Sequence, residues 1–155
     1  MDLFNTIDLN NSTICKNGHY LKHFTHKYCP SCGAETINSC TNCGNQIPFL
    51  NATSLVKNYN VPSYCQFCGK PYPWTQSIID TATEIVKEDE LLTEEQTQQL
   101  CSCFPDLLSS TPKTQLALIR YKKIVDKALS TTSSALKDIL IDIVSEAVKI
   151  ALWYD

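Results

Sequence analysis

Four pairs of potential metal ligands constrain this chain more than any other feature of its sequence. The pairs are Cys15-x3-His19, Cys29-x2-Cys32, Cys40-x2-Cys43 and Cys65-x2-Cys68. Spacing by two residues lets two thiolates reach one metal ion, and a glycine after the second cysteine of the last three pairs supplies the positive φ that closes the turn. Eight ligands make two tetrahedral sites. The pattern therefore predicts two Zn²⁺ ions per chain, bound by Cys15, His19, Cys29, Cys32, Cys40, Cys43, Cys65 and Cys68.

The sequence allows two ways to divide these ligands between the two sites. The sequential grouping joins Cys15, His19, Cys29 and Cys32 in one site and Cys40, Cys43, Cys65 and Cys68 in the other. The interleaved grouping places the two middle pairs in one site and the first and last pairs in the other. Loop-closure entropy favours local pairing, so we expect the sequential grouping.

The ligand types indicate structural rather than catalytic zinc. A catalytic zinc keeps one position open and commonly uses histidine or carboxylate, whereas seven of the eight ligands here are thiolates. The signatures of zinc deaminases and of His-Glu-x2-His metalloproteases are absent from the sequence. Either His23 or His26 could replace His19, but we expect both to lie outside the sites.

The other sequence features are those of a cytoplasmic protein. No run approaches the roughly 20 apolar residues of a membrane span, and the first residues, MDLFNTIDLN, lack the basic start and apolar core of a signal peptide. Cysteines in that compartment stay reduced. Cys101 and Cys103 point about 200° apart on a helix and cannot chelate one ion together. We expect Cys103 in the core and Cys101 nearer the surface.

The composition changes near Trp74, which predicts two domains, 1–74 and 75–155. The first contains all four glycines and the cysteine pairs, while the second shows helical patterns. We expect an α+β protein with two small zinc-ribbon or knuckle modules followed by a three- to four-helix bundle. The 21 residues between Cys43 and Cys65 are predicted to supply two or three ribbon strands.

Capping signals predict the helices. Thr75 is the expected N-cap of a helix to about Asp89, with Trp74 and Ile79 as a hydrophobic staple. The sequence Thr93-Glu94-Glu95-Gln96 has capping-box spacing and opens a short helix that Pro105 ends or kinks. Thr111-Pro112 begins a helix to about residue 129. A last helix is expected over residues 135–153.

Charge disfavours a generic nucleic-acid partner. Residues 1–74 have a formal net charge of +2, which becomes about −1 when seven thiolates and two zinc ions are counted. The helical half has a net charge of −5, so neither half is basic enough to favour phosphate binding. One predicted helix has a basic face made by Lys113, Arg120, Lys123 and Lys127. Because of this face, a nucleic-acid-associated regulator is the alternative function. We expect this face to be solvated and paired with the acidic segment 80–95. The aromatics Phe24, Tyr28, Phe49, Tyr59, Tyr64 and Phe67 are expected to fill the ribbon modules.

The predicted last helix is apolar over more than half of its circumference. Three long helices do not easily cover such a helix, so we expect self-association or a protein partner through the helical half. The segment carries more acid than base, which disfavours adsorption to a membrane.

Several motifs resemble a family of small bacterial proteins of unknown function with a double zinc-ribbon start. They are Tyr28-Cys29-x2-Cys32-Gly33, Cys65-x2-Cys68-Gly69-x-Pro71-Tyr72-Pro73-Trp74-Thr75, Pro105-Asp106-Leu107, Thr111-Pro112 and the segment 138–146. The resemblance implies bacterial origin, bound zinc, a helical C-terminal half and no assigned activity.

These observations predict a non-catalytic, zinc-stabilised interaction or adaptor protein. An enzyme is not expected, because Asp142, Ser145 and Glu146 lie close in sequence but lack a histidine partner. No small-molecule substrate is indicated.

Overall fold

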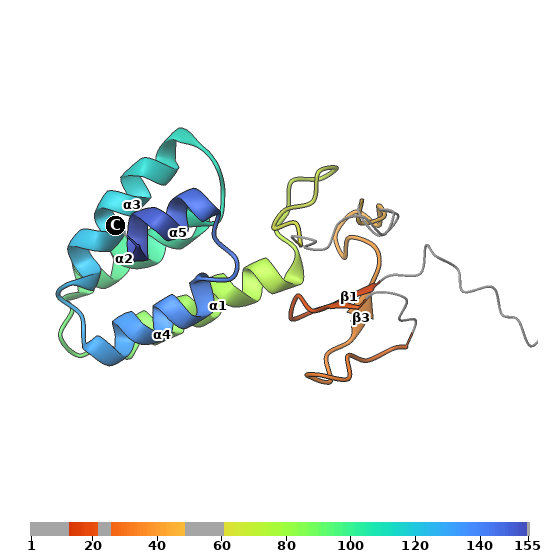
Figure 1. Ribbon diagram of the computed structural model, residues 1–155, viewed down its shortest axis with the longest axis horizontal. Coiled ribbons are helices and arrows are strands. Elements are labelled where there is room, and N and C mark those ends of the chain that lie inside the picture. The colour runs from red at the N-terminus through yellow and green to blue at the C-terminus, as the bar shows by residue number, and fades with distance from the viewer. Residues whose placement is uncertain (1–12, 22–25, 49–60, 155) are drawn as a thin grey trace, which may run out of the picture. The chain divides into compact units, whose positions relative to one another are not determined.

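Three short strands form the sheet of the N-terminal half. The computed structural model describes residues 13–21, 26–48 and 61–154, and Figure 1 shows its course. The strands β1 (Thr13–Cys15), β2 (Tyr20–Leu21) and β3 (Thr36–Ile37) lie in the order β2-β1-β3, and both pairs are antiparallel. Ile14 pairs with Tyr20 on one side and with Ile37 on the other. This small sheet and the helices that follow confirm the predicted α+β class.

The chain divides into two compact units, Met1–Gln76 and Ser77–Asp155. The first has a small core in which Ile14, Ile47, Tyr72 and Trp74 pack with the cysteines Cys40 and Cys65. Most of the strands predicted between Cys43 and Cys65 fall on residues 49–60, outside the described residues. On either side of that gap the backbone forms single antiparallel bridges, Ser39 with Gln46 and Tyr64 with Pro71.

The aromatic filling of this unit differs from expectation. Tyr28 is 54% exposed and Phe67 is 58% exposed, so the prediction that they fill the module is wrong. Both lie at the turns that carry the cysteines, where a short backbone loop leaves its side chains in solvent. Tyr72 and Trp74, stacked with ring centroids 4.8 Å apart, fill the core instead. Phe24, Phe49 and Tyr59 lie outside the described residues.

Five helices follow in the described part of the chain, against the three or four predicted. They are α1 (Pro73–Lys87), α2 (Glu94–Leu107), α3 (Pro112–Val125), α4 (Ser130–Leu140) and α5 (Glu146–Trp153). Consecutive helices α2 and α3 pack on each other, and α5 packs on α3 (Figure 1). Their core contains Phe104, Leu118, Tyr121, Leu136 and Leu140. Within the described residues, no helix is long and apolar enough to cross a membrane.

Two of the predicted helix starts are confirmed. Thr93 caps α2 in a reciprocal box: its hydroxyl accepts from the Gln96 amide at 3.2 Å, and its own amide donates to Gln96 Oε1 at 3.0 Å. Thr111 caps α3, with Pro112 at the first helical position. The sequence identifies both starts because each capping bond joins residues only a few positions apart. Pro105 lies inside α2, which continues to Leu107.

The predicted start of the first helix is wrong. The helix begins at Pro73, whose fixed φ suits a first turn. Thr75 does not cap it, because its side chain is fully buried and its hydroxyl donates to the Ser63 carbonyl at 2.7 Å. The expected staple of Trp74 on Ile79 is absent too, since Trp74 belongs to the core of the first unit and Ile79 packs on the helical core.

The segment predicted as one last helix is two helices, α4 and α5. Ser145 lies between them and caps α5, where its hydroxyl accepts from the Val148 amide at 3.3 Å. Apolar residues on more than half of one long helix could not all face a single core. The break lets Leu136 and Leu140 of α4 and Val148 of α5 each point into the same core.

Asp89 joins the end of α1 to the start of α4. Its Oδ1 accepts from the amides of Leu91 and Leu92 at 2.8 and 3.2 Å. Its Oδ2 accepts from the Leu129 amide at 2.8 Å and from the Thr132 hydroxyl at 2.6 Å. Burial raises the pKa of this carboxyl, but the four hydrogen bonds outweigh burial and hold the pKa below its ordinary value.

Candidate metal centres

Six of the cysteines are positioned by three turns that share one hydrogen-bond pattern. In the first, the Gly33 amide donates to the Cys29 carbonyl at 2.8 Å, and the Cys29 amide donates to the Ala34 carbonyl at 2.8 Å. The same two bonds recur in the turns that start at Cys40 and Cys65. The glycines that close the turns have φ of 74°, 79° and 74°, as the sequence predicts. The chain thereby turns both cysteines of each pair toward the same point.

A variant of this turn positions the first pair. Cys15 ends β1 and His19 directly precedes β2, so that the hairpin between the two strands presents both side chains. The Cys15 amide donates to the His19 carbonyl at 3.0 Å, and the His19 amide donates to Cys15 Sγ at 3.3 Å. An amide that points at sulfur stabilises the thiolate form, which is the form that binds metal.

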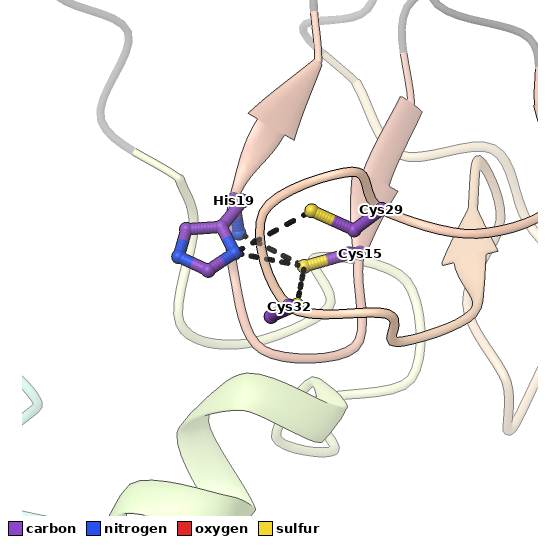
Figure 2. Close-up of side chains that lie close together, drawn as sticks. All are labelled: Cys15, His19, Cys29 and Cys32. Atoms are coloured by element: carbon purple, nitrogen blue, oxygen red, sulfur yellow. Dashed lines mark hydrogen bonds between the residues drawn. The ribbon is translucent and has the colours of Figure 1, made fainter.

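Figure 2 shows the first cluster, in which three sulfurs and one imidazole nitrogen converge. Cys15 Sγ lies 3.7 Å from Cys32 Sγ. The Nδ1 atom of His19 lies 3.4 Å from Cys15 Sγ and 3.7 Å from Cys29 Sγ. The ligand atoms of all four residues lie within 4.8 Å of one another.

The second cluster is built from four cysteines. Cys40 Sγ lies 3.7 Å from Cys68 Sγ, and Cys43 Sγ lies 3.7 Å from Cys65 Sγ. These four sulfurs also lie within 4.8 Å of one another. The structure therefore groups the eight residues in the sequential order and not in the interleaved one.

These separations fit a tetrahedral metal ion. A zinc–sulfur bond of about 2.3 Å gives sulfur–sulfur edges of about 3.8 Å in a regular tetrahedron. A zinc–nitrogen bond of about 2.0–2.1 Å gives sulfur–nitrogen edges of about 3.5 Å. The measured edges of 3.7 Å between sulfurs and of 3.4 and 3.7 Å to the imidazole nitrogen match both values. Each cluster can hold one metal ion at its centre.

Asparagine side chains support the sulfurs of both clusters, a role that the ligand spacing alone did not predict. The Ala34 amide and the Asn17 side chain lower the pKa of Cys32 to about 6. The Lys70 amide and the Asn42 side chain likewise lower the pKa of Cys68. The Asn45 side chain donates to Cys43 Sγ at 3.3 Å. Each asparagine lies within two residues of a ligand, so this proximity was the available signal.

Close packing holds the turn of the first ligand pair against Trp74, in the first turn of α1. A Cβ added at Gly18 would lie 3.1 Å from Trp74 Cβ, so only glycine fits there without displacement of the indole. Trp74 is itself fixed, because its Nε1 donates to the Pro62 carbonyl at 2.8 Å. The Pro-Trp-Thr junction is thus part of the scaffold around the clusters.

The remaining candidate ligands lie outside the clusters. His26 is exposed, and its carbonyl accepts from the Thr36 hydroxyl at 2.6 Å. His23 falls outside the described residues. Cys103 is buried in the helical core, where burial raises the pKa of its thiol to about 11, and Cys101 is partly buried. Both cysteines of α2 lie as predicted.

The basic face of α3 is exposed, but it is not paired as expected. Lys113, Arg120 and Lys123 lie on this helix, whereas Lys127 follows its end at Val125, so the prediction that all four share one helix face is wrong; all four are exposed. The ion pairs among the described residues join Lys16 with Glu35, Lys87 with Glu84 and Lys149 with Glu146. The four cations thus form no ion pair with the segment 80–95, and the predicted pairing is wrong. Residues 80–95 lie on α1 and the turn after it, whereas the main packing partner of α3 is α2.

Comparison with known proteins gives a family match over most of the chain. A family model described as "Uncharacterized protein conserved in bacteria (DUF2321)" matches residues 8–152. This match confirms the resemblance that the motifs indicate. No curated protein and no solved structure matches the chain.

Proposed function

The chain belongs to this family of uncharacterised bacterial proteins, and we propose that it is a non-catalytic, zinc-stabilised interaction protein. Its ribbon half binds two zinc ions, and its helical half mediates self-association or binding of a protein partner. The observation that carries the proposal is that each metal cluster already offers four protein ligands at tetrahedral separations.

Four ligands per ion favour a structural role for the metal. A catalytic zinc needs an open position for water or substrate, and neither cluster leaves one. Seven thiolates and one imidazole in tetrahedral arrangement suit zinc among the common divalent ions. The metal then stabilises a unit whose apolar core is small.

Two reactive groups of the helical half, Ser145 and Cys103, are engaged in the fold. Ser145, the one hydroxyl near Asp142 and Glu146, caps α5 and so accepts a backbone hydrogen bond. Cys103 is buried with a raised pKa, which keeps its thiol protonated and unreactive. These uses favour a binding protein over an enzyme.

Exposed apolar side chains support association through the helical half. Ile119 is 65% exposed, Ile150 is 53% exposed and Leu116 is 46% exposed. Apolar side chains of this size gain free energy when a partner removes them from water.

Native mass spectrometry of the full-length protein tests the metal and the oligomer together. We expect two zinc ions per chain and a dimer at micromolar concentration. Cys32→Ser and Cys43→Ser, one in each cluster, should each lower the zinc count by one, while the control Cys101→Ser should keep two. Any count other than two in the unmodified protein contradicts the metal assignment, and a monomer contradicts self-association.

The second candidate is a nucleic-acid-associated regulator that uses Lys113, Arg120, Lys123 and Lys127. The observation that favours it is the lack of ion-pair partners for these cations among the described residues. Binding of a fluorescent oligonucleotide at two salt concentrations tests it, because phosphate contacts produce a steep salt dependence. If the protein is such a regulator, binding of the oligonucleotide should weaken as the salt concentration rises and should be lost in Arg120→Glu. If the oligonucleotide binds at neither salt concentration, this candidate is rejected.

A further inference from the structure

One face of α3 combines cations with exposed apolar side chains. Residues 113, 116, 119, 120 and 123 fall within about 120° of the helix circumference. They are Lys113, Leu116, Ile119, Arg120 and Lys123, which we call the basic-apolar face. All five are exposed, including Ile119 at 65%. A solvated face needs no large apolar residues at its centre, so this pattern indicates a contact surface.

A hollow with a mixed polar and apolar lining lies beside this face. It has a volume of about 200 Å³ and lies between α2 and α3. Its lining includes Lys113, Leu116, Ala117 and Arg120 of α3 and Asp106 of α2. A phosphate backbone would make no use of the leucine, whereas an apolar side chain would pack on it. The surroundings of the hollow therefore favour an apolar side chain flanked by carboxylates over a nucleic acid.

The same chain presents such a group on another surface. The segment 88–95, which comprises the turn between α1 and α2 and the first two residues of α2 and which we call the acidic turn, carries Leu91 with 59% of its surface exposed. Exposed carboxylates surround it in sequence, at Glu88, Glu90, Glu94 and Glu95. None of these four forms an ion pair with a residue that the structure describes.

The acidic turn is also held rigid. Oδ1 of Asp89 accepts the amides of Leu91 and Leu92 at 2.8 and 3.2 Å, which fixes the backbone that presents Leu91. A preformed turn loses little conformational entropy when it binds, so it makes a good anchor.

We propose that the basic-apolar face of one copy docks on the acidic turn of a second copy. Leu91 of one protomer enters the hollow beside Leu116 of its partner, and the carboxylates of the turn approach Lys113, Arg120 and Lys123. This inference rests on the proposed self-association and assigns it a surface. A two-fold axis uses each surface once per protomer, which closes the assembly as a dimer.

Charge reversal in the full-length, zinc-loaded protein tests the docking. The double variant Arg120→Glu/Lys123→Glu places like charges across the contact, and we expect the dimer Kd to rise by about 100-fold or more in sedimentation equilibrium. The double variant Glu94→Lys/Glu95→Lys should do the same. Mixed in equal amounts, the two variants should form a heterodimer with near-original affinity, because opposite charges then face each other at both contacts.

The control Lys122→Glu reverses one charge on the same helix, outside the basic-apolar face, and should leave the dimer Kd unchanged. Helical circular dichroism and a zinc count of two verify that each variant is folded. If both double variants dimerise like the unmodified protein, the docking inference fails while self-association stands. A monomeric unmodified protein overturns both. Failure of the mixture to restore the dimer also overturns the inference, since only matched contacts predict rescue.

Discussion

Replacement of the Asp89 carboxylate by an amide should destabilise the helical half strongly. The side chain is 7% exposed and accepts four hydrogen bonds, two of them from residues 40 and 43 positions further along the chain. Asparagine keeps the shape but has one accepting oxygen, so its NH2 group must face two donors. The variant tested is Asp89→Asn.

The magnitude follows from the bonds that are lost. A hydrogen bond to a charged group contributes about 1.5–3 kcal/mol, so the loss of two costs about 3–6 kcal/mol. Removal of a buried charge returns part of this cost. We therefore expect the free energy of unfolding to fall by about 2–4 kcal/mol, a large share of the about 5–15 kcal/mol of a typical domain.

Urea unfolding followed by circular dichroism at 222 nm measures the change. The control Asp138→Asn alters an exposed carboxylate of α4 and should change the free energy of unfolding by less than about 0.5 kcal/mol. Thr132→Val removes one donor and should cost about 1–2 kcal/mol. In the double variant the two costs should not add, because both changes remove the same bond. An unchanged urea midpoint for Asp89→Asn would refute the reasoning.

The pH dependence of this effect has a definite sign. The pKa of Asp89 lies below its ordinary value of 3.8 in the folded protein. The ionised carboxylate therefore stabilises the fold at pH values above the unfolded pKa, and this contribution is lost as the pH falls through the folded value. The difference in stability between the unmodified protein and Asp89→Asn should shrink below about pH 4. A difference that grows toward low pH would contradict the assigned hydrogen bonds.

Three further predictions concern the metal centres and the free cysteines. Gly18→Ala should weaken zinc retention against a competing chelator more than Gly33→Ala. Both glycines have positive φ, which costs another residue about 1–3 kcal/mol, but only at Gly18 does the new Cβ meet Trp74. Chelation of the metal in Trp153→Phe should shift the fluorescence emission of Trp74 to the red, since this indole packs in the core that contains Cys40 and Cys65. Iodoacetamide at pH 8 should leave Cys103 unmodified in the folded protein, because its pKa of about 11 leaves little thiolate.

Each of these has a result that would contradict it. Equal zinc retention in both glycine variants would show that the contact with the indole is unimportant. If chelation leaves the emission maximum of Trp74 unchanged, the packing of the first unit's core does not depend on the metal. Alkylation of Cys103 as fast in buffer as in urea would show that the core does not protect the thiol.

The features that could be predicted correctly from the sequence depend on residues only a few positions apart. The turn at Cys29 to Gly33 is closed by bonds within six residues, and the capping boxes at Thr93 and Thr111 each span four. Loop-closure entropy favours nearby pairs, which is why the sequential grouping of the eight ligands was expected and is the one that the structure has. The sequence alone determined these features because their partners lie in the same stretch of chain.

Only the tertiary structure decided features whose partners lie far along the chain. Thr75 has the residue type of a helix cap, but the carbonyl that its hydroxyl binds belongs to Ser63, before the helix. The segment 135–153 has the periodicity of one helix, but its apolar residues reach the core only when Ser145 starts a new one. The cations of α3 and the acids of 80–95 attract each other in principle, but α3 packs on α2 and forms no ion pair with that segment. A local pattern records which interactions a residue can make, and the packing of distant segments determines which of them it does make.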